Sequence, residues 1–134
     1  MRSHDTSTCG LHCHVSRDFF GNNSDTQDLH IAKLILLINK FWDMYIVPFS
    51  RRYYSQLDRW ATKPDISINE NDTEEEIVDK VKSSKHNGRY QGINLMNEHT
   101  IEFRMFRGTL KLNTFIVSLQ FVDCICRFAK DMKL

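Results

Sequence analysis

The stretch TIEFRMFRGTL, residues Thr100–Leu110, and the stretch CGLHCHVSR, residues Cys9–Arg17, decide the fold of this chain. In both, polar and apolar residues alternate with the period of a β-strand, so each strand sorts its side chains onto two faces. One face of the two strands is apolar: Leu11, Cys13, Val15, Ile101, Phe103 and Met105. The other face is polar: His12, His14, Ser16, Glu102 and Arg104. If both strands belong to one sheet with its apolar face on the core, we expect the polar side chains to converge on the open face.

Composition places the chain among ordinary globular domains. Its 134 residues suffice for one domain with a real core, and 41% of them are hydrophobic and 26% charged. The net charge of +1 lacks the basic excess typical of dedicated nucleic-acid or membrane-surface proteins. The longest apolar stretch, Ile31–Val47, is interrupted by lysine, asparagine and aspartate, and no apolar run follows Met1, so we expect neither a transmembrane span nor a signal peptide. Four cysteines without a secretory signal then indicate free thiols in the cytoplasm.

Helical patterns and one further strand fill the rest of the chain. The expected helices cover Leu29–Val47, Arg51–Trp60, Thr73–Ser84 and Phe115–Lys130. We expect Thr26 or Asp28 to cap the first helix and Pro48 to end it. A strand at Arg89–Met96 and a tight turn at Asn97-Glu98 lead into Thr100–Phe106, which predicts a hairpin. This order predicts an α+β fold, a small antiparallel sheet of about three strands with helices packed on one face.

The polar residues of the open face suit a metal or a phosphate group. His12 and His14 lie roughly 6.5–7 Å apart along their strand and could bind a divalent metal or phosphate oxygens, or be surface histidines without a role. Glu102 could ligate Mg²⁺, and Arg104 could hold a phosphate with two hydrogen bonds. The alternative for these two is an ordinary ion pair. Arg89, on the partner strand, could add a second cation or merely cap the hairpin.

Two other kinds of site are disfavoured. Cys9, His12, Cys13 and His14 have the composition of a zinc site, but a strand sends Cys13 to the face opposite the histidines. We therefore interpret Cys13 as a small core residue. The chain contains no P-loop and no G-x-G-x-x-G motif, so a nucleotide would bind on the sheet face and not on a glycine loop.

The order of these motifs resembles a known family. CGLHCHVSR, a long apolar helix, RYQGINL, TIEFRMFRGTLKLNTF and a terminal helix together resemble the C-terminal half of the amidoligases, over about Cys9–Ala129. These enzymes belong to the carboxylate–amine ligase superfamily with glutamine synthetase. The resemblance implies half of a glutamine synthetase-like catalytic domain, with an antiparallel active-site sheet. Such a sheet binds Mg-ATP, activates a carboxylate as an acyl phosphate and admits an attacking amine.

The resemblance also implies a role for each matching residue. His12, His14, Ser16 and Arg104 would contact the nucleotide. Glu102, with His14, would hold magnesium. Arg104 and, from the preceding strand, Arg89 would act in catalysis.

The chain departs from the family before its first strand. Family members carry there a further segment with metal-binding glutamates, whereas Met1–Thr8 contains one carboxylate, Asp5. Phosphoryl transfer depends on positioning the phosphates and on neutralising their charge, so half of such an active site should lose most of the catalytic rate. Residues 1–134 are therefore interpreted as a single truncated amidoligase-like domain.

Two functions remain open. In the first, the chain is a binding or inhibitor protein of phage or mobile-element origin, for example an inhibitor of a bacterial defence nuclease such as a CRISPR effector. It would act in the cytoplasm on a protein partner, reach nucleic acid only through a protein–nucleic acid complex, and bind no membrane. In the second, it is an ATP- and Mg-dependent ligase completed by a second chain or by a homodimer partner. We expect no enzyme from the chain alone, and Mg and ATP only if the ancestral site is retained.

Overall fold

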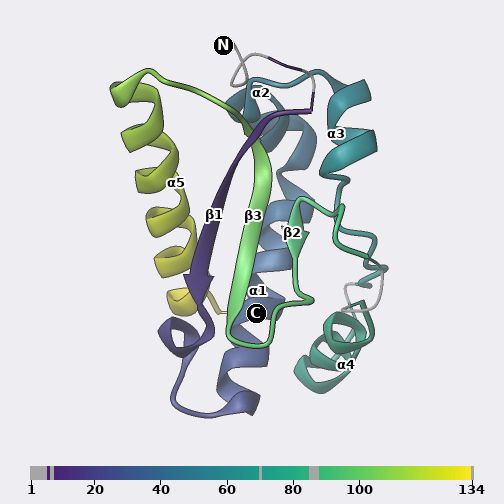
Figure 1. The fold of residues 1–134 in the computed structure, drawn as a ribbon. Coiled ribbons are helices and arrows are strands. Elements are labelled where there is room, and N and C mark those ends of the chain that lie inside the picture. The colour runs from purple at the N-terminus through teal and green to yellow at the C-terminus, as the bar shows by residue number, and fades with distance from the viewer. Residues whose placement is uncertain (1–5, 7, 70, 85–87, 134) are drawn as a thin grey trace.

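The strands of this protein form a three-stranded antiparallel sheet of order β1-β3-β2, and helices pack against it in an α+β fold (Figure 1). The computed structural model describes residues 6, 8–69, 71–84 and 88–133. The strands are β1 Gly10–Ser16, β2 Ile93–Asn94 and β3 Thr100–Arg107. The helices are α1 Ser24–Lys40, α2 Val47–Ser50, α3 Tyr54–Trp60, α4 Glu74–Ser84 and α5 Leu112–Asp131. A 3₁₀ turn, Arg17–Phe20, precedes α1, and a π-helical segment, Trp42–Ile46, follows it.

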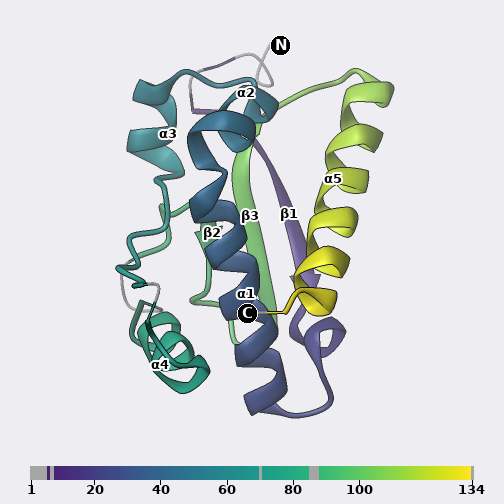
Figure 2. The ribbon, with the colours of Figure 1, turned by 180° about the vertical axis from the view of Figure 1, so that it is seen from behind.

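The helices leave one face of the sheet open. Figure 1 looks onto that face, and Figure 2 shows from behind that α1 and α5 lie across the other side, with α5 towards β1. The predicted apolar face is the buried one: Ile101, Phe103 and Met105 of β3 are fully buried with the inner side of α1, and Leu11, Cys13 and Val15 of β1 pack against this core. The alternation in the two strands therefore predicted the sides of the sheet correctly.

A β-bulge interrupts the pairing of β1 with β3. Leu11 pairs with Phe106 and Cys13 pairs with Phe103, so one β1 residue, His12, lies opposite two β3 residues. These two residues are Arg104 and Met105. A bulge bends its strand and changes the direction of the side chains beyond it. Phe106 is accordingly buried like Met105, although strict alternation would place it on the open face.

The first long helix differs from its prediction at both ends. It begins at Ser24, and its N-cap is Asn23, whose side chain accepts a hydrogen bond from the Thr26 N–H at 2.9 Å. The prediction of Thr26 or Asp28 as the cap is therefore wrong. Pro48 does not end the helical path, because it lies in the first turn of α2, where its missing N–H needs no acceptor.

The next elements are shorter than predicted. α3 begins at Tyr54 and not at Arg51, because Arg51 takes a left-handed conformation (φ 58°) that ends α2. β2 is reduced to Ile93–Asn94, although it does pair with β3 as the predicted hairpin. The residues just before it instead join Thr62, which forms an isolated parallel bridge with Gln91.

The last helix, α5, exposes several large apolar side chains on its outside. It is 20 residues long, and an 18-residue window within it has a mean hydropathy of 1.3, so by length and composition alone it could cross a membrane. The core helices of soluble proteins can have the same length and hydropathy. Here Ser118, Val122, Cys126 and Ala129 form its buried stripe.

Candidate functional site

A buried carboxylate on the central strand organises the open face. Glu102 is 6% exposed. Its Oε1 accepts a hydrogen bond from His12 Nδ1 at 2.9 Å and another from Arg104 Nη1 at 3.1 Å. Its Oε2 accepts a third from Asn94 Nδ2 at 2.8 Å, and His14 Nε2 lies 3.7 Å from Oε1. The carboxylate thus fixes the positions of side chains from all three strands.

The pairing of the strands explains why these groups meet. Glu102 lies on the middle strand, directly opposite His14 of β1 on one side and Asn94 of β2 on the other. The bulge brings Arg104 opposite His12. Thr100 lies on β3, like Glu102, and its Oγ1 lies 3.1 Å from His14 Nδ1, where it supports the ring. We call His12, His14, Asn94, Glu102 and Arg104 the polar cluster. Each of these side chains is placed by the pairing of the strands and not by a loop.

A second guanidinium closes one end of the face. Arg52, which follows α2, is buried and donates hydrogen bonds to the carbonyls of Cys9 at 2.7 Å and Arg104 at 3.4 Å. Burial, and then the charge of Arg104, lower its pKa from the ordinary value. Gly10 makes room for this side chain, since a Cβ at that position would lie 2.6 Å from Arg52 Nη2.

His12 is neutral near pH 7. Its pKa lies below the ordinary 6.5 because burial disfavours the charged ring and because Arg104 and Arg52 repel a further positive charge. The negative charge of Glu102 raises the pKa of His12, but by less than burial and the two arginines lower it. The 2.9 Å contact between His12 and Glu102 is therefore a hydrogen bond from a neutral ring and not an ion pair. Because Nδ1 carries the proton, Nε2 keeps a lone pair that can accept a hydrogen bond.

The structure brings four of the six predicted site residues together: His12, His14, Glu102 and Arg104. Ser16 serves a different purpose, because its Oγ accepts a hydrogen bond from the Asp18 N–H at 3.3 Å and caps the 3₁₀ turn. Arg89 lies in the turn before β2, outside the strand where it was predicted. Its guanidinium covers the ring of Tyr90, which in turn contacts Arg104.

Two members of the site were missed by sequence reasoning. Asn94 could have been found, because the exact register of the hairpin places it opposite Glu102. Arg51-Arg52 with Arg59 could be read as a small basic patch for phosphate, but a solvated helix face is the preferred interpretation from the sequence, because the place of Arg52 beside β1 depends on the left-handed turn at Arg51.

The open face fits an anion better than a resident magnesium ion. Mg²⁺ prefers near-octahedral oxygen coordination. The face offers one carboxylate, Glu102, which already accepts three N–H groups. Among the described residues, no group of three or more His, Cys, Asp and Glu side chains is arranged to hold a metal ion. Magnesium held by Glu102 and His14 stays a prediction, and no chemical step is derived from it.

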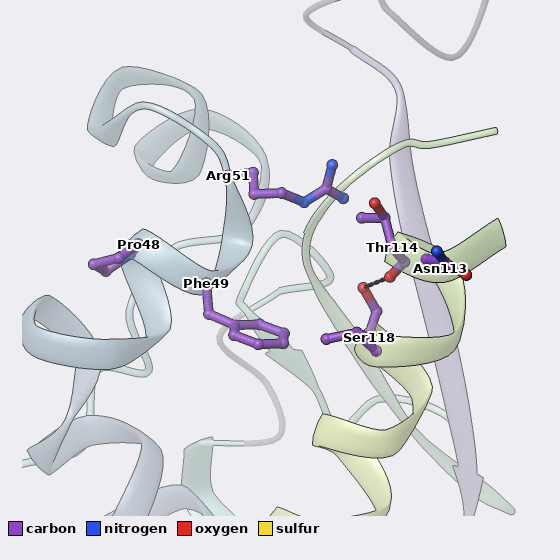
Figure 3. A pocket seen from close by; sticks show the side chains of 7 residues that line it. Pro48, Phe49, Arg51, Asn113, Thr114 and Ser118 are labelled. Carbon is purple, nitrogen blue, oxygen red and sulfur yellow. Dashed lines mark hydrogen bonds between the residues drawn. The ribbon is translucent and has the colours of Figure 1, made fainter. Parts of the chain in front are cut away.

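A separate apolar cavity lies between α2 and the start of α5. It measures about 370 Å³ and is lined by Pro48, Phe49, Arg51, Asn113, Thr114, Val117 and Ser118. Figure 3 shows Arg51 reaching from α2 towards Thr114, and Ser118 donating a hydrogen bond to the Thr114 carbonyl. The cavity contains no residue of the polar cluster.

The outside of α5 is also unusual. Leu112, Phe115, Ile116 and Leu119 follow the i, i+3, i+4, i+7 spacing of a single helix face and are each 38–68% exposed. We call these four residues the outer stripe. An apolar stripe of this kind normally packs against another element, whereas the described residues leave it uncovered.

Comparison of the chain with protein-family models, with curated proteins and with solved structures gives no match.

Proposed function

We propose that the open face binds the phosphate groups of a nucleotide, as part of an ATP-dependent carboxylate–amine ligase of the amidoligase type. The observation that carries this proposal is the buried Glu102, which holds Arg104 and His12 in fixed positions on an open sheet face. The chain would then correspond to half of a glutamine synthetase-like catalytic domain, as the resemblance of its motifs implies.

The charges and donors of the face support anion binding. Arg104 carries five N–H donors, and one of them bonds to Glu102. Its buried Nε has no hydrogen-bond partner among the described residues. Arg104 and Arg52 together outweigh the single carboxylate, so the face has a net positive charge before the histidines are counted.

Fixed donors are what phosphoryl transfer requires. The protein contributes mainly by positioning the phosphates and stabilising their charge, so donors that need no rearrangement lower the barrier most. In this proposal Arg104 contacts phosphate, Glu102 positions Arg104 and His12, and the free Nε2 of His12 accepts a hydrogen bond from substrate.

Binding of inorganic tripolyphosphate tests the proposal without requiring turnover. Calorimetry should show binding to the wild-type chain, loss of binding in Arg104→Ala, and partial recovery in Arg104→Lys. Arg127→Ala is the matched control, because Arg127 is exposed on α5 and paired with Asp123 at 2.9 Å. Equal affinity of the wild type and Arg104→Ala would contradict the proposal, as would the absence of any binding.

The outer stripe favours a second function, binding of a protein partner, and we propose a second copy of this chain as that partner. β1 is an edge strand on the α5 side of the sheet (Figure 1), so a twofold axis could pair both elements with their copies. The outer stripe contains no charge, and a net charge of +1 repels a second copy only weakly. The inhibitor role predicted from the sequence would belong to this second function.

Sedimentation equilibrium tests this second function. Ile116→Lys should abolish association, whereas Gln120→Lys, on an exposed position of the same helix, should preserve it. A wild-type chain that stays monomeric at high micromolar concentration would rule out the second copy.

A further inference from the structure

Two aromatic rings and two exposed guanidinium groups lie in contact with one another beside the polar cluster. The Arg59 guanidinium lies 4.8 Å from the centre of the Trp60 ring. The Trp60 and Tyr90 rings meet edge to face, with centroids 5.6 Å apart. The Arg89 guanidinium lies 4.9 Å from the centre of the Tyr90 ring. We call Arg59, Trp60, Tyr90 and Arg89 the aromatic–arginine ladder.

The ladder is joined to the polar cluster through Tyr90. The Arg104 guanidinium lies 5.7 Å from the centre of the Tyr90 ring while it donates a hydrogen bond to Glu102. Arg104, a member of the polar cluster, is thus in contact with the Tyr90 ring of the ladder. A ligand with a charged end at Arg104 would have its other end within reach of Tyr90.

Backbone hydrogen bonds hold the ladder in place. The Thr62 N–H donates to the Tyr90 carbonyl at 2.8 Å, and the Gly92 N–H donates to the Thr62 carbonyl at 2.7 Å. The Arg104 N–H then donates to the Gly92 carbonyl at 2.8 Å. Gly92 has no room for a side chain, because a Cβ there would lie 2.8 Å from the Trp42 ring. The distance between Tyr90 and Arg104 is therefore fixed by the sheet.

The ladder is too exposed to be explained by core packing. Tyr90 is 40% exposed, and both Arg59 and Arg89 are exposed. Among the described residues, neither arginine forms an ion pair with a carboxylate. An exposed ring flanked by guanidinium groups is a surface on which nucleic-acid bases stack, because aromatic rings and guanidinium groups are flat and attract π-systems.

We propose that the aromatic–arginine ladder stacks the planar base of a nucleoside polyphosphate whose phosphates lie at Arg104. This inference rests on the proposed phosphate site and adds to it a base-binding subsite made by Tyr90, Trp60 and Arg89. Purines bind more tightly than pyrimidines here, because a larger ring covers more of the stacking surface. Arg89, predicted from the resemblance as a catalytic residue, contacts the base in this arrangement.

Four probes separate the base from the phosphates: adenosine, ATP, CTP and inorganic tripolyphosphate. Each is titrated against the chain, with the combined fluorescence of Trp42 and Trp60 as one signal and calorimetry as a second measurement. ATP should bind about tenfold or more tightly than tripolyphosphate, from the usual contribution of one stacked base. CTP should lie between the two.

Tyr90→Ala should remove the advantage of ATP over tripolyphosphate and leave tripolyphosphate binding unchanged. Tyr90→Phe should keep the advantage, since it preserves the ring. Tyr45→Ala is the control, because Tyr45 is another exposed tyrosine and lies in the π-helical segment, outside the ladder. Circular dichroism confirms that each variant is folded.

The outcomes distinguish the two proposals. Equal affinities of the wild type for ATP and tripolyphosphate, or an advantage of ATP that survives in Tyr90→Ala, would overturn the base subsite while leaving the phosphate site standing. Adenosine binding that depends on Tyr90, without any binding of tripolyphosphate, would support the subsite and contradict the phosphate site. If no probe binds, both proposals fail.

Discussion

The open face of the sheet and the outside of α5 both depart from the usual placement of polar and apolar side chains, each in a different way. The open face buries charged side chains: Glu102 is 6% exposed and Arg52 7%. The outside of α5 exposes large apolar ones: Leu112 is 68% exposed and Phe128 58%. In most globular proteins the charges would be outside and the leucine and phenylalanine inside.

The two regions differ in whether their side chains have contact partners within the described chain. The charges of the open face find their partners within the chain, in the hydrogen bonds of Glu102 and the carbonyls that Arg52 reaches. The outer stripe of α5 finds none among the described residues. Changes on the open face should therefore alter the stability of the fold, whereas changes on α5 should alter association.

The largest effect is expected from Glu102→Ala. Removing the carboxylate leaves the donors of His12, Arg104 and Asn94 without their acceptor, and breaking a buried charge pair typically costs about 3–5 kcal/mol. The free energy of unfolding, from urea denaturation, measures this loss. Glu98→Ala, at an exposed position in the loop before β3, should change it by less than about 0.5 kcal/mol. A small loss in Glu102→Ala would show that the open face does not stabilise the fold.

A smaller loss is expected from Gly10→Ala. The added Cβ would lie 2.6 Å from Arg52 Nη2 and so displace the guanidinium that links β1 to β3. We expect a loss of about 1–3 kcal/mol, as in other overpacked sites. In an Arg52→Ala background the same substitution should have little further effect, and a double-mutant cycle measures the coupling. If the losses in free energy of unfolding of the two single variants simply add in the double variant, the contact between position 10 and Arg52 would be contradicted.

The third prediction concerns pH. The pKa of His12 is lowered in the folded state, so the unfolded chain binds a proton more readily than the folded chain does. The stability that neutral His12 contributes is fully present above about pH 6.5 and is lost as the pH falls through its lower folded pKa. His12→Gln should therefore flatten the change in urea midpoint between pH 8 and pH 5. His99→Gln, on an exposed ring, should leave that change as it is; identical profiles for both variants would exclude His12 as its source.

The smallest effect on stability is expected on α5. Leu112→Ser and Ile116→Ser should each change the free energy of unfolding by less than about 0.5 kcal/mol, because both side chains lie on the exposed outside of the helix. The same variants should weaken self-association, which light scattering measures. A large loss of stability in either would mean that the outer stripe is covered within the chain.

Strand periodicity was enough to predict the sides of the sheet and the meeting of His12, His14, Glu102 and Arg104. This succeeded because alternation depends on local geometry that any strand obeys. The position of Arg52 depends on a left-handed residue, Arg51, where glycine would have been expected. The ladder depends on Tyr90 joining Thr62 from a distant helix end, a contact that no local pattern encodes.

The pairing of β1 with β3 has a consequence for how this protein folds. Gly10 lies opposite Arg107, so the sheet joins segments from near the two ends of the described chain. Contacts so distant in sequence form late and slow the search for the native state, because a long loop must close before they are made. During synthesis the helices α1 to α4 can form while β3 is still inside the ribosome, but the polar cluster cannot. We therefore expect formation of the site to be among the last events of folding, so that a ligand bound there would select molecules that have completed it.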